Sequence, residues 1–411
     1  MSTTKTSAHV PKLRFPGFSD DAFQIKLGEV AKVTSGGTPS RQIPRYWDGQ
    51  IPWVTTSLID FNRVSCADEF ITDEGLDNSS AKLFPKGTVI MALYGQGVTR
   101  GKVAILEFEA ATNQACAAML IHDRRLVNEY LFYDLQRRYT ELRQLSNDGS
   151  QKNLSGDLLK NLEVTLPYVP EQQKVAAFLT AVDGRIEQLS RKKALLEAYK
   201  KGVMQQLFTQ TLRFQDDHGH DFPDWEEKRL SQVATITKGS GISKADIDAN
   251  GDTPCIRYGE LYTDYGELID EVKSRTSLPR KDLVMSRKND VIIPSSGETH
   301  IDIARAACVI HDDVALGGDL NIMQTKQNGV FLAYYLNNAC KHAIARVAQG
   351  SSVVHLYPDQ LKGLLLRLPS LPEQTKIASF LSALDGKIGA VGEQMRQTQA
   401  WKKGLLQQMF V

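Results

Sequence analysis

The sequence contains few cysteines, and none of them stands in a pattern that binds a metal or builds a disulfide framework. Disulfide scaffolds and zinc sites use close, regular spacings, often as Cys-x-x-Cys pairs. Here the five cysteines are odd in number, scattered and without such a pair: Cys66, Cys116, Cys255, Cys308 and Cys340. We therefore expect no structural disulfide and no zinc site, and the cytoplasm is the simplest compartment for such a chain.

Long hydrophobic runs are also missing. A membrane-spanning helix needs about 18 or more consecutive apolar residues, and no such run occurs. The first ten residues lack the apolar centre of a secretory signal, so residues 1–10 are expected to form a flexible tail. A hydrophobic content of 42% and a charged content of 24% are typical of a globular protein. A length of 411 residues favours two to three domains.

The chain has almost no net charge. A formal charge of +1 does not support nucleic-acid binding through bulk charge. Local basic clusters occur at Arg124-Arg125 and from Arg137 to Arg143, but a solvated helix face explains them equally well. If the protein binds DNA, partner proteins are expected to supply much of the phosphate contact.

Catalytic motifs are absent too. No Asn-Pro pair occurs, which excludes the Asn-Pro-Pro-Tyr type of motif used for amino-methylation, and no triad or paired carboxylates can be recognised. The glycine-rich stretch from Tyr94 to Lys102 departs from a phosphate-binding loop, because its glycine spacing differs and Val103 replaces Ser or Thr. It is either a turn between strands or a loop that contacts DNA. No metal site is expected, and the pair His218 and His220 is set aside. The sequence predicts a non-enzyme.

What the sequence does contain is an internal repeat. The stretch LPYVPEQQKVAAFL at Leu166 recurs as LPSLPEQTKIASFL at Leu368, and the likeness continues without a gap to Phe208 and Phe410 at a constant offset of 202 positions. Shorter echoes precede each copy, among them Leu-Arg-Phe at Leu13 and at Leu212. The chain is therefore predicted to alternate globule, helix, globule, helix.

Each repeated stretch predicts a long helix with a coiled-coil seam. A proline and a glutamate mark the helix start, and apolar residues follow at alternating steps of three and four. A helix of about 37 residues would be about 55 Å long, more than one small globule needs. We therefore favour an antiparallel pair over helices that each cover their own globule. The residues predicted to hold the pair together and to dock partners are Leu179, Val182, Ile186, Leu189, Leu196, Lys200, Leu381, Leu384, Ile388, Val391 and Lys402.

Two features of the predicted seams recur at matched positions. Lys200 and Lys402 occupy the same seam position, where a polar residue can fix the register of the helices. Glycines also recur within both helices, namely Gly184, Gly386, Gly202 and Gly404. They are expected to permit close helix approach, although each lowers helix stability by about 1 kcal/mol relative to alanine.

The globules are predicted to be α+β, with short strands and glycine-rich turns followed by a helix. Expected strands span 89–93, 102–106 and 115–121 in the first globule and 291–293, 306–310 and 320–324 in the second, with helices at 127–145 and 330–348. The predicted division is a tail at 1–10, a first domain at 11–168, a helix at 169–210, a second domain at 211–370 and a helix at 371–411. The apolar framework repeats while the polar loop residues differ, which suits two modules of one fold that recognise different targets.

These motifs resemble the specificity subunit of type I restriction–modification systems. The resemblance rests on the two Leu-Pro-x-x-Pro-Glu-Gln-x-Lys stretches, each ending in Lys-Lys-Gly-x-x-Gln-Gln-x-Phe, and on Leu13 to Phe18. It also rests on Gly-Thr-Pro-Ser at Gly37, followed by Tyr46-Trp47 and Ile51-Pro52-Trp53. The second globule has Gly-Ser-Gly-Ile-Ser at Gly239 and lacks the Thr-Pro of the first, so its base contacts are less sharply defined.

The resemblance implies two α/β target recognition domains that alternate with two helices in an antiparallel coiled coil with pseudo-twofold repetition. Each domain would read one half of a bipartite, asymmetric site in double-stranded DNA, and the helices would set the spacer. The chain would bind no cofactor itself. Two methyltransferase subunits, with S-adenosylmethionine, would dock on the helices and flip adenines, and two restriction subunits, with ATP and Mg²⁺, would join for cleavage. No membrane partner is implied.

The resemblance also selects candidate DNA contacts. Amides of Asn and Gln pair with adenine, Arg pairs with guanine, and carboxylates accept from cytosine. The candidates are polar residues of the predicted loops: Thr38, Ser40, Thr56, Ser57, Tyr94, Gln96, Thr99, Arg100, Lys102, Asn113, Gln114, Gln151, Lys152, Lys238, Arg257, Tyr258, Ser295, Ser296, Glu298, His300, Asp319, Ser351, Ser352 and His355. Two alternatives stay open, namely a specificity subunit of a related type IIB-like system and a coiled-coil scaffold without a role on DNA.

Overall fold

The computed structural model describes residues 10–95, 97–145 and 153–411. The chain forms two compact units, and each is discontinuous in sequence. Unit 1 consists of residues 1–190 and 393–411, and unit 2 of residues 191–392. Each unit thus combines one globule with a part of both long helices. In the part of the chain that the structure describes, no helix is both long and apolar enough to cross a membrane.

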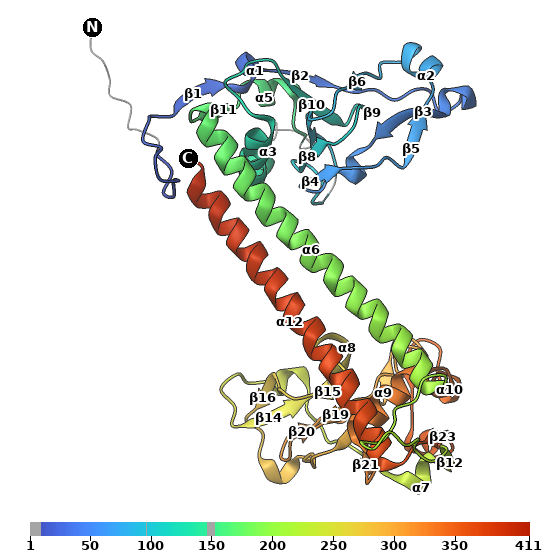
Figure 1. Cartoon of the computed structure of the whole chain (residues 1–411). Coiled ribbons are helices and arrows are strands. Elements are labelled where there is room, and N and C mark those ends of the chain that lie inside the picture. The colour runs from blue at the N-terminus through green and yellow to red at the C-terminus, as the bar shows by residue number, and fades with distance from the viewer. Residues whose placement is uncertain (1–9, 96, 146–152) are drawn as a thin grey trace. The chain divides into compact units, whose positions relative to one another are not determined.

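The globule of unit 1 is built on two sheets (Figure 1). The larger has the order β2 (Ala31–Ser35), β10 (Cys116–Ile121), β7 (Val89–Ala92), β8 (Val103–Leu106) and β4 (Asn62–Val64). The smaller has the order β5 (Glu69–Ile71), β3 (Trp47–Val54), β9 (Ala110–Thr112) and β6 (Leu83–Phe84). A separate antiparallel pair joins β1 (Phe23–Lys26) to β11 (Glu163–Leu166). Short helices complete it: α1 (Leu27–Val30), η1 (Pro44–Tyr46), η2 (Thr56–Leu58), α2 (Asp73–Asp77) and α5 (Gly156–Lys160).

Unit 2 repeats this topology. Its larger sheet has the order β13 (Ala234–Lys238), β21 (Leu320–Thr325), β17 (Asp290–Pro294), β19 (Ala307–Val309) and β15 (Leu268–Ile269). Its smaller sheet has the order β16 (Ser274–Thr276), β14 (Thr253–Ile256) and β20 (Ala315–Leu316). Two antiparallel pairs are β12 (Glu226–Arg229) with β23 (Leu365–Leu368), and β18 (Ser296–Gly297) with β22 (Val354–His355). The short helices are α7 (Leu230–Val233), η3 (Lys244–Asp246), α8 (Glu260–Thr263), η4 (Arg280–Asp282) and α11 (Pro358–Lys362).

The two larger sheets correspond strand for strand. In both, four strands pair antiparallel and the last strand pairs parallel, β4 with β8 and β15 with β19. In the smaller sheets β3 and β9 pair parallel, as do β14 and β20. The predicted α+β class and internal repeat are confirmed, and the six strands expected from the sequence fall on β7, β8, β10, β17, β19 and β21.

The prediction of one helix after these strands was wrong in both globules. Residues 127–145 form two helices, α3 (Asn128–Arg137) and α4 (Tyr139–Gln144), and residues 330–348 form α9 (Gly329–Asn338) and α10 (Lys341–Val347). At the first break Arg138 leaves the helical conformation with φ −80° and ψ 6°. Its buried guanidinium donates to Asp134 Oδ1 at 3.1 Å and to the Glu163 carbonyl at 2.8 Å. A tertiary hydrogen bond, rather than a proline or glycine, thus ends the helix.

The long helices are α6 (Val169–Phe208) and α12 (Leu371–Met409). Their Glu-Gln starts are buried and bind the neighbouring chain. In unit 1, Arg14 donates to both oxygens of Glu171, at 2.7 and 2.6 Å. Gln172 accepts from Val127 N at 2.9 Å and donates to the Arg125 carbonyl at 2.7 Å. The glutamate therefore holds the segment that leads into the globule, and the glutamine holds the turn before α3.

Unit 2 uses the same contacts. Arg213 donates to the two oxygens of Glu373 at 3.2 and 2.9 Å, and Gln374 accepts from Asn328 N at 3.0 Å, just before α9. The repeated Leu-Arg-Phe and Pro-Glu-Gln motifs are therefore the two sides of one junction. From the sequence, the glutamates were expected only to stabilise the helix dipole, and their pairing with Arg14 and Arg213 was not predicted.

Within each unit the helices run antiparallel along the predicted seam. In unit 1, Val175, Leu179 and Val182 of α6 share a core with Leu405 and Met409 of α12. In unit 2, Val203 and Leu207 share a core with Ile377 and Leu381. The remaining seam residues are buried, namely Leu189, Leu384 and Val391, or half-buried, namely Ile186, Leu196 and Ile388. These cores also contain residues of the globules, so each helix covers its globule and pairs with its partner helix.

This packing predicts that Leu381→Asp unfolds unit 2. Leu381 is 0% exposed, so the new carboxylate would be buried without a partner. The expected loss exceeds about 4 kcal/mol and appears in thermal unfolding followed by circular dichroism. Leu195→Asp, at a leucine 61% exposed on α6, is the matched control and should melt like the parent protein. Equal melting of the two variants would contradict the buried seam.

Candidate nucleic-acid interface

In unit 1, backbone hydrogen bonds tie together the segments that follow β2, β3, β7 and β9. Gly37 N donates to the Thr112 carbonyl at 2.8 Å, and Asn113 N donates to the Val54 carbonyl at 3.1 Å. Leu93 N donates to the Ala115 carbonyl at 2.8 Å, and Leu154 N donates to the Leu93 carbonyl at 3.1 Å. Loops from both sheets therefore meet at one edge, which we call the recognition edge of unit 1.

Unit 2 has the same four hydrogen bonds at the equivalent edge. Ser240 N donates to the Leu316 carbonyl at 3.0 Å, and Gly317 N donates to the Ile256 carbonyl at 2.9 Å. Ser295 N donates to the Asp319 carbonyl at 2.8 Å, and Leu356 N donates to the Ser295 carbonyl at 3.0 Å. This recognition edge of unit 2 thus shares its backbone with unit 1, while the side chains at the matched places differ.

One glycine in each unit is required for this meeting of loops. A Cβ on Gly36 would lie 1.9 Å from the Thr112 carbonyl oxygen, and a Cβ on Gly239 would lie 2.0 Å from the Gly317 carbonyl oxygen. No other residue type allows the first loop to lie so close to the strand end. The repeated Gly in the otherwise divergent loops is explained by this contact.

The recognition edge of unit 1 brings together several predicted contact residues. Thr38 donates to Gln114 Oε1 across two loops. Thr56 and Ser57 lie on the turn after β3, where the Ser57 hydroxyl is 2.6 Å from that of Thr55. Tyr94 is exposed and follows β7, and Ser40 is exposed beyond Thr38. Asn113, the residue directly after β9, is half-buried.

The glycine-rich loop is held by contacts with α4 (Tyr139–Gln144). Arg143 donates to the carbonyls of Arg100 at 3.2 Å and Gly97 at 2.6 Å. The guanidinium of Arg100 donates back to the Arg143 carbonyl at 3.2 Å. Lys102 is ion-paired with Asp60 at 2.6 Å, and Thr99 lies on the loop beside it. The predicted contacts Gln96, Gln151 and Lys152 lie outside the described residues.

Arg41 is a candidate at this edge that the sequence did not reveal. Its guanidinium lies 3.6 Å from the centre of the Trp47 ring and binds Glu69 through both nitrogens, one at 2.9 Å. The hydrogen bond from Arg41 lowers the pKa of Glu69, so the pair stays charged. Arg41 follows Gly-Thr-Pro-Ser directly, which is the signal that could have pointed to it.

The recognition edge of unit 2 carries a different set. Lys238 lies at the end of β13 with its amine 5.3 Å from the Tyr357 ring, and His355 stacks on the same ring. Arg257 and Tyr258 follow β14, and the exposed Asp319 follows β20. Ser295 is buried beneath the edge.

The other predicted contacts of unit 2 lie around a neighbouring cavity of about 550 Å³. Ser296, Glu298 and Ser352 line it together with Tyr258. His300 and Ser351 are exposed on the adjoining loops. The DNA-contact role of all these residues stays a prediction.

Two buried polar atoms at the edges have no hydrogen-bond partner within the residues that the structure describes. They are Asn113 Oδ1 in unit 1 and Arg257 Nε in unit 2. Buried polar groups are nearly always paired, so each such atom requires an explanation. One is an acceptor and the other a donor, so the two edges differ in the hydrogen-bonding group that they leave unpaired among the described residues.

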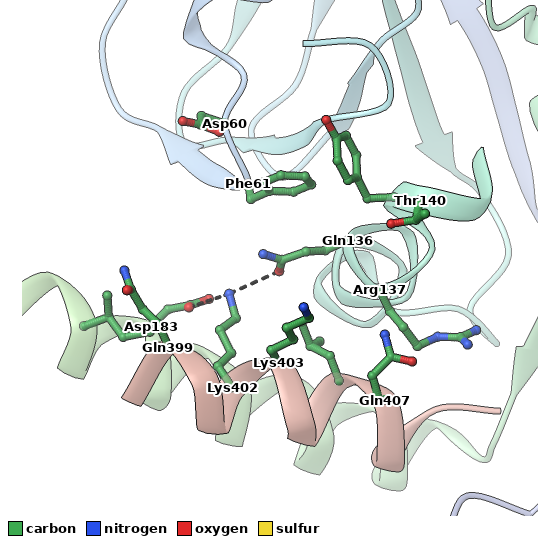
Figure 2. Close-up of a pocket in the computed structure, with 13 residues that line it drawn as sticks. Asp60, Phe61, Gln136, Arg137, Thr140, Asp183, Gln399, Lys402, Lys403 and Gln407 are labelled. Carbon is green, nitrogen blue, oxygen red and sulfur yellow. Dashed lines mark hydrogen bonds and ion pairs between the residues drawn. The ribbon is translucent and has the colours of Figure 1, made fainter. Parts of the chain in front are cut away.

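The seam lysines form matching ion-pair clusters between helix and globule. In unit 1, Lys402 Nζ lies 2.6 Å from Asp183 Oδ1 and 3.1 Å from Gln136 Oε1, and Tyr133 donates to Asp183 Oδ2 at 2.8 Å. Figure 2 shows the lysine between the aspartate and the glutamine. Lys402, Asp183 and Gln136 line a cavity of about 560 Å³ between the helices and the globule of unit 1.

In unit 2, Lys200 lies 2.7 Å from Asp385 Oδ1 and 3.4 Å from Glu267, and Tyr334 donates to Asp385. Each lysine thus reaches the aspartate of the other helix, and that aspartate binds a tyrosine of the globule. The sequence predicted a register-fixing lysine but not its partners, because the two aspartates also fit an exposed helix face.

The recurring glycines do not mediate close helix approach, so that expectation was wrong. A Cβ on Gly184, Gly202 or Gly386 would meet nothing within 4 Å, and one on Gly404 would only reach Gln408 Nε2 at 4.0 Å. These glycines face open space beside the seam.

Three of the cysteines carry buried, unreactive thiols, whereas Cys66 is exposed. Burial raises the pKa of Cys116, Cys308 and Cys340 to about 12, so these thiols stay protonated. In the described ranges, no group of three or more His, Cys, Asp or Glu could hold a metal ion. His220 instead lies 3.3 Å from Asp216 in a surface turn.

The lysine clusters predict a specific stability effect. Asp183→Ala leaves the buried Lys402 charge without its partner and should cost about 2 kcal/mol, less than the roughly 3–5 kcal/mol of a fully buried pair because Asp183 is 33% exposed. The double variant Asp183→Ala/Lys402→Met removes both charges and should recover most of the loss. Urea unfolding measures the stability of both variants. Glu187→Ala is the control, because Glu187 is exposed and lies one helical turn after Asp183 on α6. A loss equal to that of the control would argue against a stabilising pair.

A family model describing the type I restriction modification DNA specificity domain matches residues 20–198 and 223–395. The specificity subunit of the type I restriction enzyme MjaIX of Methanocaldococcus jannaschii is 26% identical over 383 residues, covering 88% of this chain and 86% of its own length.

Solved structures show the same fold. The S subunit of a type I restriction–modification system from M. genitalium superposes with a TM-score of 0.61 at 16% identity, covering 98% of this chain and 99% of the other. A chain from a structure of type I restriction–modification complex assembly gives 0.56 at 18% identity, covering 97% and 99%. With the repeated fold and the two matched segments, the chain belongs to the family of type I restriction–modification DNA specificity domains.

Proposed function

We propose that this chain is the DNA-specificity subunit of a type I restriction–modification complex. Each recognition edge reads one half of a bipartite, asymmetric site in double-stranded DNA. The observation that carries the proposal is that both edges keep the same backbone hydrogen bonds but present different polar groups, from Asn113 and Gln114 in one to Arg257 and Asp319 in the other. A shared frame with unlike side chains suits recognition of two different half-sites.

The chain acts through partners in this proposal. Two methyltransferase subunits, which bind S-adenosylmethionine, dock on α6 and α12, and two restriction subunits, which use ATP and Mg²⁺, join them. The formal net charge of only +1 supports this division, because phosphate contacts dominate the affinity of DNA binding and other subunits can supply them. The curated relative is named a specificity subunit, not a methyltransferase or nuclease.

Different observations distinguish the two alternatives from the proposed function. A type IIB-like system would use the same architecture, and only the partner's sequence distinguishes it. A scaffold without a role on DNA would leave target choice unaffected by changes at the recognition edges. The family match to a DNA specificity domain favours DNA recognition.

The proposal predicts sequence-specific adenine methylation. The chain is expressed with the methyltransferase subunit of its own system in a host without DNA methylation, and modified adenines are mapped across the genome. We expect one bipartite motif with two unlike halves and an unspecified spacer. The methyltransferase alone is the control and should produce no such motif. A complex that assembles but leaves the DNA unmodified would favour the scaffold.

The proposal also predicts that the helices set the spacer length. One heptad inserted in α6 between Ser190 and Arg191, and one in α12 between Gly392 and Glu393, leaves the contacts inside both units unchanged. Seven residues add about 10 Å of helix, so the spacer should lengthen by about three base pairs while both half-sites persist. Insertion in α6 alone is the control and should impair assembly. An unchanged spacer would contradict a ruler role.

A further inference from the structure

Arg257 of unit 2 has an unusual position for a surface arginine. It lines a cavity of about 850 Å³ at the recognition edge, together with Tyr258, Gly241, Gly317, Gly318 and Asp319. Its side chain is only 24% exposed, and Nε is one of the buried atoms without a hydrogen-bond partner in the described part of the chain. A recessed cationic donor without an acceptor is costly unless a ligand supplies the acceptor.

Glu260 holds this arginine in place. The buried carboxylate accepts from the Arg257 backbone N–H at 2.7 Å, and its other oxygen lies 3.7 Å from Nη2 of the guanidinium. Ser274 donates a further hydrogen bond to Glu260. The carboxylate is therefore fixed by the fold and orients the guanidinium from one side, while Nε has no acceptor among the described residues.

The neighbouring loop is built to make room for this side chain. A Cβ on Gly317 would lie 3.2 Å from the Ile256 carbonyl oxygen and 3.4 Å from Arg257 Cα. In unit 1 the side-chain sizes at the two matched positions are reversed. The short Thr55 stands in place of Arg257, and the longer Asn113 stands in place of Gly317. Each edge thus presents one long planar hydrogen-bonding group, an amide in unit 1 and a guanidinium in unit 2.

The surroundings select the kind of acceptor. Asp246, Asp319 and Lys244 also line the cavity, and the buried Glu260 lies behind Arg257. Three carboxylates against two cations disfavour a DNA phosphate at this place. A neutral base edge carries no such penalty. Guanine offers two acceptors, O6 and N7, in the major groove, whereas adenine pairs an acceptor with a donor and thymine offers one acceptor. A guanidinium has donors only, so guanine is its best match.

We propose that Arg257 reads a guanine in the half-site recognised by unit 2, with Glu260 as its positioning residue. The inference rests on the proposed function and deepens it by naming one base pair and the residue that selects it. Asp319, which lines the same cavity, could accept from the N4 amino group of a cytosine.

The test compares Arg257→Ala, Arg257→Gln and Arg257→Lys in the complete complex with its methyltransferase. Genome-wide adenine mapping gives the motif of each. In the parent motif one half-site should contain a G·C pair at which Arg257→Ala lowers discrimination roughly ten- to hundredfold. Arg257→Gln should shift the preference at this position toward adenine, because a glutamine amide matches adenine N6 and N7. The other half-site and the spacer should not change.

Arg280→Ala is the matched control, since Arg280 is an exposed arginine of the same unit that pairs with Asp313 outside the cavity. It should leave the motif intact. Arg257→Lys keeps a cation beside Glu260 and disturbs the fold least, and it too should relax the position because an ammonium is a point donor. Glu260→Gln should weaken discrimination at the same position and nowhere else.

A measurement on the unaltered complex supports the same conclusion independently. Duplexes carrying 7-deazaguanine at one guanine at a time lack the N7 acceptor, and binding should fall roughly tenfold at a single guanine of one half-site, with no effect in the spacer. In the Arg257→Gln complex this sensitivity should disappear. A parent motif without G·C in one half, or unchanged discrimination in all Arg257 variants, would overturn the inference and leave the proposed function standing. Absent methylation by the parent complex would instead count against the function itself.

Discussion

The pairing of a lysine on one long helix with an aspartate on the other is the interaction on which the two units depend. Lys402 belongs to the second sequence repeat and Asp183 to the first, yet both lie in unit 1. Lys200 and Asp385 make the reverse exchange in unit 2. Because Tyr133 and Tyr334 bind the same aspartates, the pair also fixes the helices to the globule. Any other register of the helices would leave a buried charge unpaired, and that cost excludes it.

The repeated Pro-Glu-Gln motif has a second purpose in this arrangement. Its glutamate binds the arginine that precedes the globule, and its glutamine binds the turn before α3 or α9. Both long helices therefore start from a rigid junction with their own globule. A motif that the chain repeats at nearly constant spacing therefore answers two needs. It attaches a globule to its helix and places the lysine at the position where the other helix supplies an aspartate.

Much of the fold could be predicted because its signals are local. Strands such as β7 and β17 are short apolar runs between turn residues, and the seam follows from the spacing of Leu179, Val182 and Leu189. What could not be predicted depends on distant partners. The break at Arg138 arises from a hydrogen bond to Glu163, and the role of Glu171 arises from Arg14. The glycines of the helices were misinterpreted because a sequence does not show whether a neighbour faces them.

The recognition edges show the same division between frame and side chains. The sequence placed Asn113 and Arg257 among many polar loop residues, but only the structure shows that each carries a buried atom without a partner in the described residues. The frame around them consists of backbone hydrogen bonds and of glycines whose role is steric, neither of which depends on the polar side chains. A long group on one loop requires a small residue on its neighbour, as Gly317 beside Arg257 illustrates. Placing a longer side chain at one of these two positions therefore requires a small residue at the other, while the sheets, the junctions and the helix register remain as they are.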